Sequence, residues 1–200
     1  MSRRRSPARL PLRVHATGAF WAVLSVSWLL DDWGVLPCFL AAALLHELGH
    51  LAALQALGIP VYCLELRASG AVIRADLRQT PQELWAYAAG PGVNLLLGFA
   101  LRRTLPGFAL CNLALGLWNL LPAEGLDGGQ LCALALPRLL GRAGEYLCKL
   151  LHLSVICSAA ALGLWGSCVL RLGPLPLLLG GLFLLRLPKR TGQTAPRLIQ

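Results

Sequence analysis

Residues 35–57 form an apolar stretch whose acidic, basic and imidazole side chains are confined to the segment His46-Glu47-Leu48-Gly49-His50. A helix rises about 1.5 Å per residue, so this stretch is long enough to cross the roughly 30 Å hydrocarbon core of a bilayer. Ionisable side chains are costly to bury at that depth and need an internal partner. We therefore expect a chain that folds in lipid and provides a binding partner for this segment.

The composition of the whole chain also favours a membrane protein. Of its 200 residues, 56% are hydrophobic and 14% are charged, and the mean hydropathy is +0.64. A soluble domain would need a larger charged surface. The formal net charge of +9 does not indicate nucleic-acid binding, because the arginines and lysines cluster near the two ends of the chain and the sequence between them is apolar. The expected surroundings are a lipid bilayer.

Apolar segments recur along the chain and predict an all-α polytopic membrane protein with about six transmembrane helices. Two of them, the fourth and the sixth, are short for a complete span. The six segments are residues 15–30, 35–57, 84–101, 107–121, 146–170 and 172–185.

Residues 59–79 have a different pattern, which predicts a short β-hairpin between the second and third helices. Gly58 and Pro60 end the preceding helix, and two runs, Val-Tyr-Cys-Leu-Glu-Leu and Ala-Val-Ile-Arg-Ala-Asp-Leu, flank Ser69-Gly70. The edges of such a hairpin could pair with an extended substrate peptide. A plain connecting segment is an equally good interpretation.

The distribution of positive charge predicts the orientation in the membrane. With the N-terminus inside, most arginines and lysines fall in cytoplasmic regions, as expected for loops near helix ends. We therefore expect both termini in the cytoplasm. The predicted organisation is a basic tail over residues 1–14, a membrane domain over residues 15–187 and a second basic tail over residues 188–200.

The spacing of the two histidines indicates a zinc site. On a helix, His46 and His50 lie on one face at the separation that allows both imidazoles to bind one Zn²⁺, and Glu47 lies close enough to act as a base. A chance match is improbable within a bilayer, where three such side chains on one turn would lack any partner. A catalytic zinc ion needs a third protein ligand and an open position for water.

Two acidic residues could provide the third ligand. Asp127 is the better candidate, because glycines and Pro122 interrupt the helix around it and irregular backbone at membrane depth lines cavities. Glu124 is the alternative, one turn away if the helix continues. His15 and His152 have no companion residue at metal-ligand spacing, and we expect both at the membrane interface.

Three motifs in order resemble those of the site-2 protease family of intramembrane zinc metalloproteases. The resemblance implies that His46, His50 and Asp127 bind one zinc ion, that Glu47 is the catalytic general base, and that Asn119 helps to hold substrate. The motifs, between about residues 44 and 129, are His46-Glu47-Leu48-Gly49-His50, Ala89-Gly90-Pro91-Gly92-Val93-Asn94, and Asn119-x-x-Pro122-x-x-x-Leu126-Asp127-Gly128.

The compact layout resembles the sporulation branch of that family, whose members cleave a membrane-associated sigma-factor precursor. The resemblance implies a membrane-protein or membrane-associated peptide substrate, such as a sigma-factor precursor or an anti-sigma factor, and a membrane regulatory protein as a further partner. The chain departs from the pattern because the residues after the sixth segment are too few for a CBS domain, and no PDZ domain is inserted.

Two other functions are compatible with parts of this pattern. A metal transporter would also place His and Asp in membrane helices, but it would need polar residues along a complete path across the bilayer. An inactive protease-like scaffold would be expected to have lost a ligand or the base, and all four residues are present. The sequence therefore favours a zinc-dependent endopeptidase over both alternatives.

Overall fold

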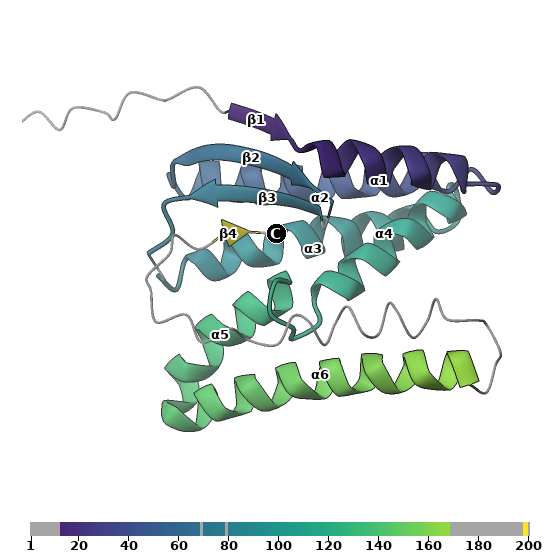
Figure 1. The fold of residues 1–200 in the computed structure, drawn as a ribbon. Helices are drawn as coiled ribbons and strands as arrows, with labels where there is room; N and C mark the ends of the chain where they lie inside the picture. Colours follow the sequence, from purple (N-terminus) through teal and green to yellow (C-terminus); the bar gives the residue numbers. More distant parts are fainter. Residues whose placement is uncertain (1–12, 69, 79, 169–197, 200) are drawn as a thin grey trace, which may run out of the picture.

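The computed structural model describes residues 13–68, 70–78, 80–168 and 198–199, which form six helices and four strands (Figure 1). In chain order these elements are β1 (Arg13–Ala16), α1 (Gly18–Leu29), α2 (Leu36–Ala56), β2 (Val61–Arg67), β3 (Gly70–Ala75), α3 (Glu83–Leu101), α4 (Pro106–Asn119), α5 (Asp127–Leu140), α6 (Arg142–Cys168) and β4 (Leu198–Ile199).

Helices α2, α3 and α4 pack against one another and form the centre of the fold. Glycines allow this close approach: a Cβ at Gly49 would lie 2.9 Å from the carbonyl oxygen of Ala89, and one at Gly98 would lie 3.1 Å from that of Ala109. Small residues at helix interfaces are typical of membrane bundles, where van der Waals packing and interhelical hydrogen bonds drive association. Asn94 adds such a bond, since its Nδ2 donates to the carbonyl oxygen of Ala42 at 3.3 Å.

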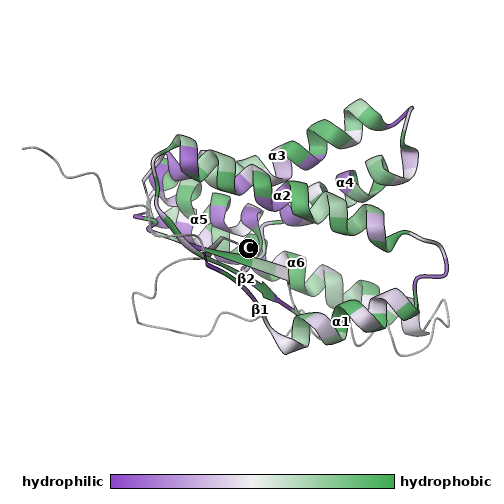
Figure 2. Cartoon of the chain, turned by 90° about the horizontal axis from the view of Figure 1, so that it is seen from above, coloured by the Kyte–Doolittle hydropathy of each residue, from purple (hydrophilic) through white to green (hydrophobic). Residues whose placement is uncertain are grey.

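Three described helices are long and apolar enough to span a membrane, namely α2, α3 and residues 142–165 of α6. Figure 2 shows hydrophobic residues along most of α1, α3, α4 and α6, and more hydrophilic ones near α5. With 12 and 14 residues, α1 and α4 are only about 18 and 21 Å long, which is less than a full span. The chain is thus a helical membrane protein, and the predicted sixth segment lies outside the described residues.

Helix α5 was not predicted as a separate helix from the sequence. It follows an irregular loop, residues 120–126, and packs against α3 and α6. Its buried residues are Asp127, Gly128 and Leu134, and a polar residue, Gln130, is also present. A short helix of mixed polarity gives no membrane-span signal, which explains why the sequence pattern missed it.

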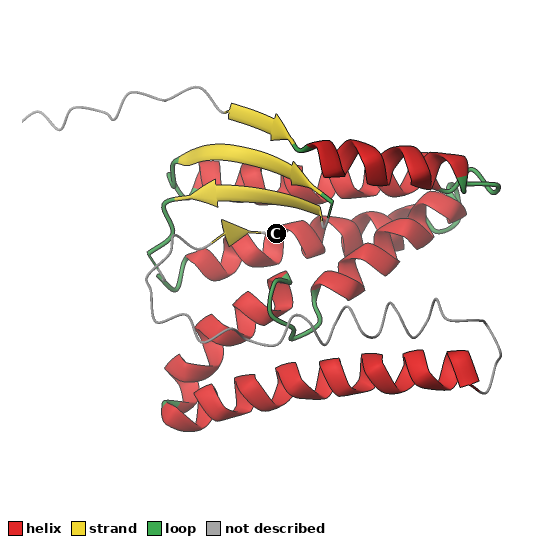
Figure 3. Ribbon diagram, in the orientation of Figure 1, coloured by secondary structure: helices red, strands yellow, loops and turns green. Residues whose placement is uncertain are grey.

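The predicted hairpin between the second and third long segments is confirmed (Figure 3). Strands β2 and β3 pair in antiparallel register, with Arg67 opposite Gly70 at the turn. The sheet order is β1-β2-β3-β4, so β1 and β4 flank the hairpin on its two sides. Residues 13–16 were expected to end the tail and begin the first helix; they instead form β1, parallel to β2.

Side chains accept hydrogen bonds from backbone N–H groups at the start of the first two helices. The Thr17 side chain accepts a hydrogen bond from the Phe20 backbone N–H at 3.2 Å, which caps α1. The carboxylate of Asp31 accepts from the N–H groups of Val35 and Leu36, each at 2.9 Å, at the start of α2. A carboxylate at this position is favoured because helix N-termini carry unpaired donors and a partial positive charge.

Glu65 is the centre of an ion-pair cluster on the hairpin. Its carboxylate accepts from Arg74 Nε at 2.6 Å and from Arg67 Nε at 3.0 Å. These charge-assisted bonds lie across the β2–β3 pair and within β2 itself. The hydrogen bonds from Arg74 and then Arg67 lower the pKa of Glu65 from its ordinary value of 4.5 to about 2.

This lowered pKa predicts a pH dependence of hairpin stability. Because the folded-state pKa lies below the ordinary value, the ionised carboxylate stabilises the hairpin above pH 4.5, and this stabilisation is lost as the pH falls toward about 2. We expect the wild type to have a higher Tm than Glu65→Gln at neutral pH and the difference to shrink over that window. A Tm difference that is constant from pH 5 to pH 2 would contradict the assignment.

Candidate metal centre

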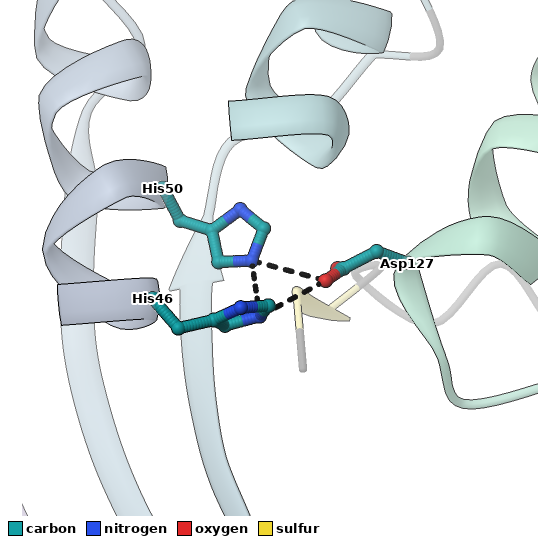
Figure 4. Close-up of side chains that lie close together, drawn as sticks. All are labelled: His46, His50 and Asp127. Carbon is teal, nitrogen blue, oxygen red and sulfur yellow. Dashed lines mark hydrogen bonds and ion pairs between the residues drawn. The ribbon is translucent and has the colours of Figure 1, made fainter. Parts of the chain in front are cut away.

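Helix α2 carries the two histidines of the HExxH sequence on one face. The side chain of His46 is 3% exposed and that of His50 is fully buried. One helical turn separates them, and the two Nε2 atoms lie 3.1 Å apart. The predicted spacing of the two imidazoles is therefore confirmed (Figure 4).

The third side chain at this position is Asp127, the first residue of α5. Its carboxylate is fully buried, and Oδ2 lies 3.1 Å from His46 Nε2 and 3.2 Å from His50 Nε2. Within the described part of the chain, these three residues are the group of His, Cys, Asp and Glu side chains whose donor atoms could share one metal ion. The structure thus brings together residues that are 81 positions apart in the sequence.

The size of this triangle suits a zinc ion. Ligand atoms at about 2.0–2.1 Å from a tetrahedral zinc lie about 3.3–3.4 Å from one another. The three separations here, 3.1, 3.1 and 3.2 Å, are close to that value. Two imidazole nitrogens and one carboxylate oxygen are also a donor set that zinc uses in catalytic sites, with the fourth position left open. The cluster fits one zinc ion.

The hydrogen bonds around the histidines favour a cation at this position. His50 Nδ1 lies 2.7 Å from the carbonyl oxygen of Ala86, which can only accept, so Nδ1 carries a proton. In the neutral ring Nε2 then presents a lone pair toward the carboxylate of Asp127. Buried His46 Nδ1 and Asp127 Oδ1 have no hydrogen-bond partner. A metal ion would remove the repulsion between the lone pairs, and the Ala86 carbonyl orients the ring as outer-shell groups do in zinc sites.

The loop between α4 and α5 fits closely around the start of α5. A Cβ at Gly128 would lie 2.6 Å from the carbonyl oxygen of Leu121 and would overlap that of Leu120. A Cβ at Gly129 would overlap the carbonyl oxygen of Ala123. Only glycine allows the loop and the first turn of α5 to lie this close together. This close contact fixes the position of Asp127 relative to the loop.

Glu47 and Glu124 lie in different surroundings. Glu47 follows His46 on α2, and its buried Oε2 has no hydrogen-bond partner. Its carboxylate is close enough to interact electrostatically with His46, His50 and Asp127. Glu124, the alternative third ligand, is 57% exposed, and its carboxylate oxygen lies 3.9 Å from His152 Nε2. The structure thus places Asp127, and not Glu124, beside the two histidines.

The remaining residues of the resembling motifs are found near the cluster or in helix contacts. Asn119 is 9% exposed, and its Nδ2 donates to the carbonyl oxygen of Leu115 in its own helix at 3.1 Å. Its predicted role toward substrate stays a prediction. Gly90 faces the His50 ring, since a Cβ there would lie 2.7 Å from His50 Cε1. Sequence reasoning did not identify the Ala86 carbonyl, because any residue at that position provides the same group.

Comparisons with known proteins agree with this description. No family model matches the chain. It is 29% identical over 140 residues to a zinc metalloprotease of Methanocaldococcus jannaschii, covering 61% of this chain and 41% of the relative. It is 28% identical over 135 residues to stage IV sporulation protein FB of Bacillus subtilis, covering 61% and 47% respectively. The chain therefore spans less than half the length of these two curated relatives.

The fold has a solved counterpart. The site-2 protease from Methanocaldococcus jannaschii matches with a TM-score of 0.63 and 25% sequence identity, over 87% of this chain and 88% of that structure. The match thus extends over most of both chains. The chain therefore resembles the site-2 protease family in both sequence and fold.

Proposed function

We propose that the chain is a zinc-dependent intramembrane endopeptidase that hydrolyses a peptide bond of a membrane-associated substrate. The observation that carries the proposal is the buried His46, His50 and Asp127 triangle, formed by a membrane-length helix and the start of α5. Zinc metalloproteases among the relatives support the same activity.

Each residue of the site has a proposed part in the reaction. His46, His50 and Asp127 hold the zinc ion, which when bound would supply an acidified water and a positive charge next to the substrate carbonyl. Glu47 accepts the proton of the attacking water at its carboxylate and later delivers it to the leaving amine. Its partially buried position and unpaired Oε2 leave it available for both transfers. The Ala86 carbonyl holds His50 in the required orientation.

The substrate has to reach this site in an extended form, because the carbonyl groups of an intact transmembrane helix are bonded internally. The β2–β3 hairpin has limited room for a substrate strand, because other strands already pair with both of its edges. Strand β1 pairs with β2 over its four residues, whereas β4 pairs with β3 only at Ile73 and Arg74. A substrate strand on the hairpin would therefore add next to β3, where the existing pairing is shorter.

Asn119 and the membrane orientation complete the proposal. Asn119 ends α4, close in sequence to the loop that leads to Asp127, and the second N–H of its Nδ2 would donate to substrate while the first binds the Leu115 carbonyl. The arginine and lysine distribution supports cytoplasmic termini. Exposed Glu124 supports water entry from the same side.

The substrate class rests on the relatives. Stage IV sporulation protein FB is a sporulation protein by name. The resemblance of the compact layout to the sporulation branch implies a membrane-associated sigma-factor precursor as substrate and a membrane regulatory protein as partner. An anti-sigma factor is the other candidate. A panel of single-span proteins that includes both classes would separate them.

The test of the proposed activity is cleavage by the purified protein beside Glu47→Gln, with bound zinc measured for both. We expect the wild type to hold about one zinc ion and to cleave, and Glu47→Gln to keep the zinc and lose about 10²- to 10⁴-fold in rate, the usual contribution of a general base. Glutamine is close in shape to glutamate but cannot accept the proton.

Other outcomes would favour other functions. A wild type that binds no zinc would overturn the proposal. Zinc uptake into proteoliposomes that Glu47→Gln leaves intact would favour a transporter. Binding of membrane proteins without cleavage, at equal affinity in both forms, would favour an inactive scaffold.

A further inference from the structure

The backbone turn that precedes Asp127 is held by a side chain from another helix. The loop over residues 120–126 closes on itself through two backbone bonds: Ala123 N–H donates to Leu121 at 2.7 Å, and Leu126 N–H donates to Ala123 at 3.1 Å. Ala123 and Leu126 are buried, with 2% and 7% exposure. The backbone N–H of Glu124, between them, donates out of the loop to α6.

The acceptor on α6 is His152. Its Nδ1 lies 2.8 Å from the Glu124 backbone nitrogen, and its side chain is among the buried polar groups of the fold. Because Nδ1 accepts, the neutral ring carries its proton on Nε2. That Nε2 is buried without a hydrogen-bond partner and lies 3.9 Å from the Glu124 carboxylate. His152 therefore binds the Glu124 backbone N–H through Nδ1. Its Nε2 is a second, longer contact with the Glu124 carboxylate.

This contact is mechanically linked to the candidate metal centre. Glu124 lies three positions before Asp127 along the chain, and the glycines after Asp127 are in close contact with the carbonyl oxygens of the same loop. A loop held so closely at both ends cannot shift at Glu124 without moving the start of α5. Helix α6 packs on α5 as well, so the histidine and the aspartate belong to one packed unit.

We propose that His152 is a positioning residue for the metal centre: it fixes the loop before α5 and thereby the carboxylate of Asp127. The inference rests on the proposed function, since it takes Asp127 to be a zinc ligand. His152 itself does not contact the metal. Its position on α6 also makes the geometry of the site dependent on how α6 packs against the rest of the bundle.

Two substitutions of His152, to asparagine and to glutamine, test whether its Nδ1 atom is the one that positions the loop. In His152→Asn the side-chain oxygen takes the place of Nδ1, and in His152→Gln it takes the place of Nε2. We expect the asparagine variant to bind zinc within about threefold of the wild type. The glutamine and leucine variants should bind about 10- to 100-fold more weakly, the range found for outer-shell residues of zinc sites.

The measurement is zinc affinity by competition with a chelator on the detergent-solubilised full chain, together with Tm of the metal-free forms. His152→Asn and His152→Gln differ by one methylene, so a purely structural role would give both the same zinc affinity, and that result would overturn the proposal. Wild-type affinity in His152→Leu would also overturn it. In either case zinc binding and Glu47-dependent cleavage by the wild type would remain, whereas a wild type without zinc would overturn the proposed function as well.

Discussion

Replacing Gly90 with alanine is expected to abolish zinc binding and, with it, cleavage. A Cβ at this position would overlap His50 Nε2 and lie 2.7 Å from Cε1. The ring cannot move aside while Nδ1 donates to Ala86 at 2.7 Å, so the imidazole must rotate and break that bond. Rotation takes Nε2 out of the triangle with His46 and Asp127. Zinc content of the purified variant measures the effect directly.

Gly92→Ala is the matched control for this experiment. It lies two residues further along α3, and a Cβ there would meet nothing within 4 Å. Alanine in place of glycine inside a helix stabilises it by about 0.5–1 kcal/mol. We therefore expect Gly92→Ala to bind zinc and to cleave like the wild type, with an unchanged or raised Tm. Equal zinc binding by the two variants would contradict the packing of His50 against Gly90.

The parts of the fold that follow from local patterns were predictable from the sequence. The apolar stretch around His46 is long enough for a span, and it forms α2. The two runs on either side of residues 69–70 form the β2–β3 hairpin, because turn residues and strand formers are both local signals. The spacing of His46 and His50 fixes their common face once the segment is known to be a helix.

Other parts depend on contacts between distant segments and carry no local signal. Strand β1 forms because residues 13–16 meet β2, and its sequence also suits the beginning of a helix. Helix α5 is short and is stabilised by packing on α3 and α6. The hydrogen bond of His152 to the Glu124 backbone depends on α6 returning to the loop, and spacing in the sequence cannot indicate this.

The identity of the third ligand also depends on contacts that the sequence does not indicate locally. Local chemistry leaves Asp127 and Glu124 as alternatives, because both are carboxylates near the end of the same apolar segment. The structure separates them through the backbone. The turn over residues 120–126 directs Asp127 inward at the start of α5 and leaves Glu124 outside, 57% exposed.

This separation predicts opposite results for two alanine variants. Asp127→Ala removes the single oxygen that lies within 3.2 Å of both histidine nitrogens, so the two remaining ligands cannot hold zinc and its content should fall to background. Glu124→Ala retains the backbone N–H that binds His152, so zinc content and cleavage should stay within about twofold of the wild type. Both are measured on the purified chain beside Glu47→Gln, which should keep its zinc. Loss of zinc in Glu124→Ala with retention in Asp127→Ala would make Glu124 the ligand and would mean that the loop adopts another arrangement when the metal is bound.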